Sequence, residues 1–155
     1  MTNEEIFIRL GTALGLGMLI GFERIYHKHD AGVRTHAITA MGACLFMMTG
    51  IMIGGNYSDN NYLHQEVWRS LAQILGSIIV GIGFLGAGLI FTTDKNNHKK
   101  GLTSAATLWT TAAIGAACAF GFIHMAVITT LLVLFTLTFM ASLEWTLVKY
   151  FKRDK

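Results

Sequence analysis

Hydrophobic residues are grouped along the chain in five long runs, which short polar segments separate. The clearest run is Gln73–Phe91, nineteen residues with five glycines and no charged side chain. A helix needs about 20 such residues to cross a bilayer. The pattern therefore predicts an all-α integral membrane protein, a compact bundle of five transmembrane helices at Ile6–Phe22, Ala37–Gly54, Leu71–Phe91, Leu102–Gly121 and Met125–Val148.

The composition supports a membrane protein and excludes several other classes. Hydrophobic residues make up 53% of the 155 residues and charged residues 14%, with a mean hydropathy of +0.51. The net charge of +3 is better explained by basic loops facing an anionic leaflet than by a nucleic-acid partner, and we expect none. Cys44 and Cys118 lie inside apolar runs, where buried free thiols are the usual state. The acidic start, MTNEE, is unlike a signal peptide, so we expect the first run to be kept as a helix.

The positions of the basic residues predict the orientation of the helices. Ten of the twelve Lys and Arg residues lie between the first and second runs, between the third and fourth, or after the fifth. Only Arg9 and Arg69 fall on the other side. Because cytoplasmic loops collect Lys and Arg, we expect the N-terminus outside and a basic cytoplasmic tail at Lys149–Lys155. The outside segment Gly55–Arg69 is polar, and a solvated loop is favoured there over a short helix or a partner surface.

Glycines in the third run predict close helix packing. The stretch Gly81–Gly86 matches the pattern G-x-G-x-x-G, but a nucleotide site also needs a preceding strand and a helix N-terminus, which an uninterrupted apolar helix lacks. A helix would instead place small residues on two faces, so that other helices pack on both sides of it. The residues that we expect to make these contacts are Gly76, Gly81, Gly83 and Gly88. Glycines spaced four apart in other runs, Gly11/Gly15, Gly17/Gly21 and Gly50/Gly54, also favour a compact bundle.

Polar residues gather where the first run ends and the second begins. Glu23 and Arg24 follow the first run, and Arg34, Thr35 and His36 precede the second. A carboxylate and a guanidinium at the membrane edge are costly unless paired, so we expect Glu23 to pair with Arg24 or Arg34. The pair either fixes the hairpin between the two helices or forms a functional mouth. For His36, a simple hydrogen-bonding role at the interface is favoured.

The fourth run is rich in hydroxyl side chains. Thr103, Thr107 and Thr110 share one helical face, and Ser104, Thr107 and Thr111 share another. Hydrogen bonding between helices is favoured over a conduction path. The apolar runs contain no acidic pair that would hold a dehydrated Mg²⁺, so we predict no metal site. No nucleophile with an adjacent base is visible, so we expect neither an enzyme nor a cofactor.

Four motifs, taken together and in order, resemble a known family. These are GLGMLIGFER, AGVRTHAITAMGACLF, QILGSIIVGIGFLGAGLIF and GLTSAATLWTTAAIG. They are similar to the transmembrane domain of the MgtC/SapB family of bacterial inner-membrane proteins, over roughly residues 5–121. The family's characteristic polar residues fall on Glu23, Arg24, Arg34, Thr35, Thr103 and Thr107, with Thr110 as a further candidate. Some relatives have Asn at the place of Thr103 and Cys at the place of Thr110.

The resemblance implies a multi-pass protein of the bacterial inner membrane that acts in adaptation to low magnesium and, in pathogens, in survival inside host cells. It further implies regulation of other membrane machines, such as the ATP synthase or P-type ATPases, through helix–helix contacts. The alternative is a transporter or channel for Mg²⁺ or another small solute, and a homo-oligomer is compatible with either. Longer relatives carry a soluble C-terminal domain, whereas residues 1–155 are expected to form a single transmembrane domain.

Overall fold

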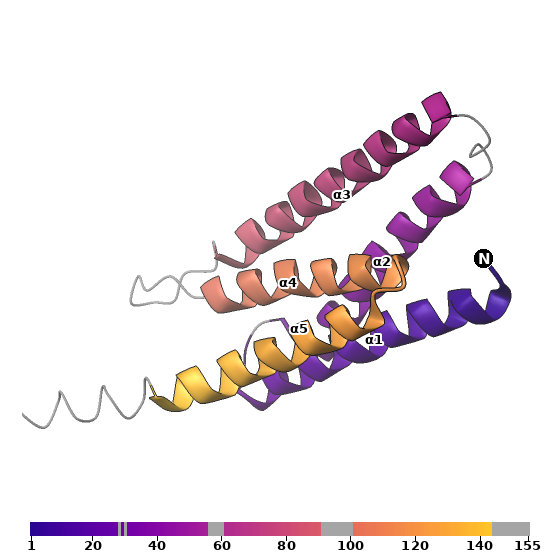
Figure 1. The fold of residues 1–155 in the computed structure, drawn as a ribbon. Coiled ribbons are helices and arrows are strands. Elements are labelled where there is room, and N and C mark those ends of the chain that lie inside the picture. The colour runs from indigo at the N-terminus through magenta and orange to yellow at the C-terminus, as the bar shows by residue number, and fades with distance from the viewer. Residues whose placement is uncertain (28, 30, 56–60, 91–100, 144–155) are drawn as a thin grey trace, which may run out of the picture.

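The computed structural model describes residues 1–27, 29, 31–55, 61–90 and 101–143, and it is built from helices (Figure 1). Each of the five helical spans is long and apolar enough to cross a membrane, which confirms the predicted fold class. The fifth span continues through a π-helical segment as far as Leu143. The elements are α1 (Asn3–Tyr26), α2 (Val33–Gly55), α3 (Asn61–Ile90), α4 (Leu102–Ala119), α5 (Ile123–Phe135) and the π-helical η1 (Thr136–Met140).

Helix α4 lies at the centre of the bundle and contacts α1, α2, α3 and α5 (Figure 1). In its apolar window 61% of the residues are buried, whereas only 6% are buried in the corresponding window of α3. Helix α3 lies at the edge of the bundle, where α2 and α4 supply its contacts. The core combines Ile20 of α1, Met47 of α2, and Ile114 and Cys118 of α4, all at most 1% exposed.

Glycines bring α1, α2 and α4 together at backbone distance. A Cβ atom at Gly17 would lie 2.6 Å from the carbonyl oxygen of His36, and one at Gly115 would overlap the carbonyl of Ala40. Gly21 faces the backbone of Val33 in the same way. Any side chain at these positions would push two helix axes apart. The predicted close contact is therefore confirmed for Gly17/Gly21, and side chains of α3 lie close to Gly50/Gly54. It is wrong for Gly11/Gly15, where a Cβ atom would meet nothing within 4 Å.

The glycines of α3 behave differently from the prediction. No atom outside the helix's own backbone lies within 4 Å of a Cβ built at Gly76, Gly81, Gly83 or Gly88. The expectation that other helices of this chain pack on both sides of α3 is therefore wrong at these positions. The reason is topological, because the long α3 lies at the rim of the bundle and its small residues face outward. Contact of these glycines with another chain stays a prediction.

Polar residues extend α1, α2 and α3 beyond their predicted bounds. Helix α2 begins at Val33, four residues before the predicted start, so its first turn includes the polar residues that precede the apolar run. Helix α3 begins at Asn61, which makes most of the segment predicted as a solvated loop helical. Hydropathy locates the part of a helix that lies in the hydrocarbon, and these helices continue past it into the aqueous edge.

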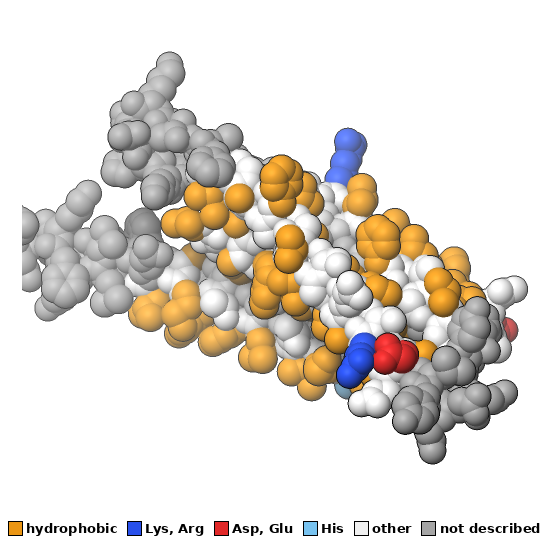
Figure 2. All heavy atoms as spheres, turned by 90° about the horizontal axis from the view of Figure 1, so that it is seen from above, with side chains coloured by type: hydrophobic (Ala, Val, Ile, Leu, Met, Phe, Trp, Pro, Cys, Tyr) orange, Lys and Arg blue, Asp and Glu red, His pale blue; other side chains and the backbone are white. Residues whose placement is uncertain are grey.

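The surface of the bundle is apolar, as a lipid-facing surface requires. Phe7, Phe84 and Val80 expose 81%, 80% and 74% of their surface. Figure 2 shows mainly hydrophobic side chains (orange) together with backbone and other uncharged side chains (white) over the described face, with few charged groups. Side chains of this kind are stable against acyl chains and would be unfavourable against water.

Candidate functional site

Glu23 and Arg24 form a buried ion pair at the end of α1. The Arg24 Nε atom donates to Glu23 Oε2 at 2.5 Å, and the two side chains are 3% and 8% exposed. Of the two predicted partners of Glu23, the structure therefore selects Arg24, while Arg34 is exposed. The His27 ring lies against the same carboxylate, with Nδ1 3.0 Å from Glu23 Oε1. Each of these two buried charges is therefore compensated by the other.

His36 is fully buried in the first turn of α2 and faces α4. Its Nε2 atom lies 3.2 Å from the Thr107 hydroxyl, which itself donates to the Ser104 carbonyl at 3.0 Å. Since the threonine proton is used in that bond, the threonine oxygen can accept from Nε2 in the tautomer that is protonated there. The charges of Arg24 and Glu23 lie close enough to act on this ring. The predicted hydrogen-bonding role of His36 is confirmed, and the structure adds that its side chain is fully buried.

Together these side chains form one polar cluster where α1, α2 and α4 meet. We call it the buried polar cluster. Its α4 members are almost completely enclosed, and Thr111 donates to the carbonyl of Thr107 at 2.7 Å. Two of its buried polar atoms, Arg24 Nη1 and His36 Nδ1, have no hydrogen-bond partner among the described residues, and Glu23 Oε1 has only the contact with the His27 ring. The members are Glu23, Arg24, His36, Ser104, Thr107 and Thr111.

The structure brings together some of the residues singled out from the sequence and leaves others apart. Glu23, Arg24 and Thr107 meet in the buried polar cluster. Thr110 is partly exposed and donates to the Ala106 carbonyl of its own helix at 2.9 Å. The side chains of the other three candidates are exposed and do not join the cluster: Arg34, Thr35 and Thr103.

Sequence reasoning did not select three members of the cluster. The hydroxyl face that Ser104 shares with Thr107 and Thr111 was visible from helical spacing, but nothing in the spacing marked it as the buried one. His36 lacked a signal because it precedes the apolar run, and only the early start of α2 places it inside the bundle. Among the described residues, no group of three or more His, Cys, Asp or Glu side chains could hold a metal ion.

Comparison with known proteins finds one family model and several bacterial relatives. The family model described as "MgtC family" matches residues 10–145. The chain is 38% identical over 125 residues to "Protein MgtC" of Brucella abortus, covering 81% of this chain and 47% of that protein. It is 36% identical over 127 residues to "Protein MgtC" of Salmonella typhimurium, covering 82% and 48%. An uncharacterized protein of Haemophilus influenzae is 36% identical over 129 residues, covering 83% and 52%.

The chain thus spans about half the length of the curated relatives that it matches. No solved structure matches it. The family match covers most of the five helical spans, and the named relatives are bacterial. This chain is a multi-pass bacterial membrane protein and belongs to the MgtC family.

Proposed function

We propose that this protein regulates other machines of the bacterial membrane by helix–helix contact, without catalysing a reaction itself. The observation that carries the proposal is the outward-facing stripe of α3, where Gly76 and Gly83 have no neighbour within 4 Å. Small residues let two helix backbones approach closely in lipid, where the hydrophobic effect does not drive association. In α1, α2 and α4, glycines are already used in contacts of this kind. On α3 they offer the same surface to a second protein.

Membership of the MgtC family supplies the physiological setting of the proposal. By resemblance, the protein acts in adaptation to low magnesium and in survival of pathogens inside host cells. The partners implied in the same way are the membrane subunits of the ATP synthase and P-type ATPases. A contact through α3 would need no soluble domain, since the described helices already present the stripe.

The hydroxyl groups of α4 give less support to a transport function. Thr107, Thr110 and Thr111 each donate to a carbonyl of their own helix, at 2.7 to 3.0 Å. On the other side, Gly115 packs directly on the backbone of Ala40. A water-filled path needs polar groups that are free to face the solute. Within a single described chain these hydroxyls serve packing, so transport is the second candidate.

The decisive experiment places a photo-crosslinking residue at Gly83 in cells grown at low magnesium. We expect capture of an identified membrane subunit of the ATP synthase or of a P-type ATPase. Gly83→Leu should reduce co-purification of that subunit in mild detergent, because the leucine side chain would hold the helices apart. Gly11→Leu is the matched control, since Gly11 also lies on an exposed helix face with open space around it. Equal co-purification of both variants would contradict the proposal.

The transport alternative is tested on the same purified material. Thr107→Val keeps the shape of the side chain but removes a hydroxyl of the buried polar cluster. In liposomes, a transporter whose path includes this hydroxyl would lose Mg²⁺ flux while staying folded. Flux that is absent in the unchanged protein, or equal in both proteins, would remove this path from consideration.

A further inference from the structure

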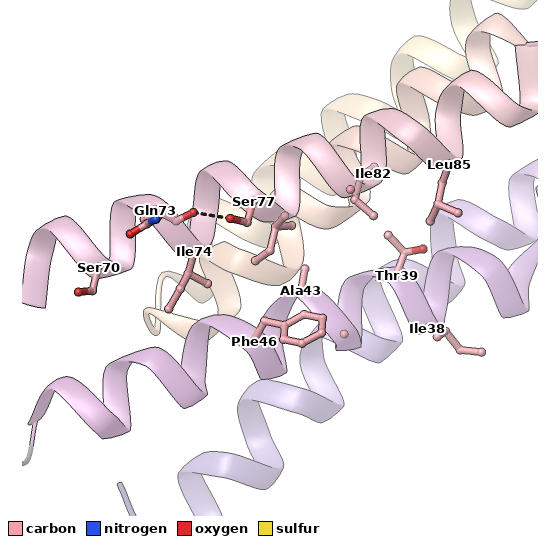
Figure 3. A pocket seen from close by; sticks show the side chains of 13 residues that line it. Ile38, Thr39, Ala43, Phe46, Ser70, Gln73, Ile74, Ser77, Ile82 and Leu85 are labelled. Atoms are coloured by element: carbon pink, nitrogen blue, oxygen red, sulfur yellow. Dashed lines mark hydrogen bonds between the residues drawn. The ribbon is translucent and has the colours of Figure 1, made fainter.

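Helix α2 presents two different faces to its surroundings. Figure 3 shows the first, where Thr39 and Phe46 line an open groove between α2 and α3. The second face carries the sulfur-containing residues Cys44 and Met48, which are 0% and 2% exposed. The Cys44 thiol donates to the Met48 sulfur at a distance of 3.6 Å. This face therefore holds a thiol and a thioether in contact inside the core of the bundle.

Helix α4 brings a second thiol to the same part of the core. Helices α2 and α4 run in the same direction (Figure 1), and Gly115 packs directly on the backbone of Ala40. Cys44 lies one turn beyond Ala40 on the same face of α2, and Cys118 lies almost one turn beyond Gly115 on α4. Cys118 is 0% exposed, and the two thiols are close enough to act on one another electrostatically. We call Cys44, Met48 and Cys118 the sulfur cluster.

A cation lies beside the sulfur cluster. The Arg9 guanidinium of α1 donates from Nη1 to the carbonyl of Ala119 at 2.6 Å, and Ala119 directly follows Cys118. The same guanidinium is close enough to the Cys44 thiol to act on it electrostatically. A nearby cation stabilises negative charge on sulfur, and the effect is strong in an apolar core that lacks water. The sulfur cluster therefore has its own countercharge.

We propose that the sulfur cluster binds one soft monovalent metal ion, Cu(I) or Ag(I), through the thiolates of Cys44 and Cys118 and the thioether of Met48. Thiolate and thioether ligands select Cu(I), whereas Mg²⁺ requires oxygen ligands. With metal–sulfur bonds of about 2.3 Å, the spacing of the Cys44 and Met48 sulfur atoms gives an angle of roughly 100° at the metal, close to tetrahedral. The set has only two cysteines, and a methionine completes it.

Charge balance favours a monovalent ion in this position. On binding, the two thiols release their protons to solvent, and the metal keeps its oxidation state. Two thiolates, one Cu(I) and the Arg9 guanidinium together carry no net charge, whereas a divalent ion would leave an excess positive charge in the core. Cys118 is the penultimate residue of α4, so the ion has a short way in from the turn between α4 and α5. The site does not depend on the proposed regulatory function.

Titration of the untagged full chain in detergent with Cu(I), without oxygen and against a chelator of known affinity, tests the site. We expect one Cu(I) per chain, sulfur neighbours at about 2.3 Å in X-ray absorption, and no competition by Mg²⁺. Cys44→Ala and Cys118→Ala should each weaken binding by about 100-fold, and Met48→Leu by roughly 10-fold. Met47→Leu is the matched control, because Met47 is equally buried but points about 100° away from Met48 around α2.

Further measurements separate loss of binding from loss of folding. Ag(I) should raise the unfolding temperature of the unchanged protein but not that of Cys118→Ala, because only a bound ion stabilises the folded state. Arg9→Met should weaken Cu(I) binding by roughly 10-fold, and Arg9→Lys should retain it, because lysine keeps the countercharge. Met48→Leu conserves volume and serves as the test if an alanine variant does not fold.

Three results would each overturn the proposal. The first is the absence of stoichiometric Cu(I) binding by the unchanged protein. The second is unchanged binding in Cys44→Ala, which would assign the ion to another place in the chain. The third is an equal effect of Met47→Leu and Met48→Leu, which would show that core packing rather than a metal–sulfur bond accounts for the loss.

Discussion

At the scale of single residues, glycine has two different uses in this bundle. Gly17 and Gly21 of α1 and Gly115 of α4 lie against the backbone of α2, where no side chain fits. Gly76 and Gly83 of α3 have open space around them. A substitution at the first kind should affect folding, and one at the second kind should affect contacts with other molecules. The two kinds can be separated by measurement.

Gly115→Ala should destabilise the folded bundle. The added methyl group would overlap the carbonyl oxygen of Ala40, so α2 and α4 must move apart. Overpacking of this kind costs about 1–3 kcal/mol. Gly76→Ala is the control, because open space surrounds it and alanine is the better helix former. The free energy of unfolding of both variants is measured in mixed detergent micelles. Equal values would contradict the close contact between Gly115 and Ala40.

Arg24→Met should lower the stability of the bundle by more than the loss of an exposed arginine would. The substitution leaves the Glu23 carboxylate buried without its cation, a loss of about 3–5 kcal/mol for enclosed pairs. The double variant Glu23→Gln, Arg24→Met removes the stranded charge and should recover part of the loss. Arg34→Met is the control at an exposed position. If both single variants unfold alike, the buried pair does not contribute to stability.

At the scale of helices, the sequence predicted all five spans because a bilayer demands long apolar runs. It did not predict the first turns of α2 and α3, since those turns are polar and hydropathy does not report them. The same limit hid His36, which belongs to the buried polar cluster only because α2 starts at Val33. Glycine spacing identified the residues able to make close contacts. It could not tell that α3 lies at the rim, because spacing within one helix says nothing about its neighbours.

One side chain links the start of α1 to the end of α4. Arg9 of α1 donates from Nη1 to the carbonyl of Ala119, the last residue of α4, at 2.6 Å. A cation there satisfies an unpaired carbonyl and interacts favourably with the helix dipole. Arg9→Met should therefore lower the free energy of unfolding by roughly 1–2 kcal/mol. Arg69→Met, at an exposed surface pair, should have a much smaller effect.

At the scale of the whole molecule, the five antiparallel helices divide the described polar groups between two ends. The start of α1 meets the end of α4 through Arg9, so these two lie at one end. The buried polar cluster, with Arg24 and nearby Arg34, lies toward the opposite end. If the positive-inside rule applies, the cluster faces the cytoplasm and the turn between α4 and α5 faces outward. The orientation decides from which compartment a proton, solute or soluble factor would reach the cluster.

Labelling of single cysteines in intact cells tests this orientation. His124 and Arg34 are both exposed and lie at opposite ends of the bundle, whereas Cys44 and Cys118 are buried and should contribute little background. We expect a membrane-impermeant maleimide to label His124→Cys in intact cells. Arg34→Cys should react only after the membrane is opened, because the start of α2 is predicted to lie on the cytoplasmic side. The reverse pattern would place the basic segments outside, and the buried polar cluster would then lie toward the outer end of the bundle.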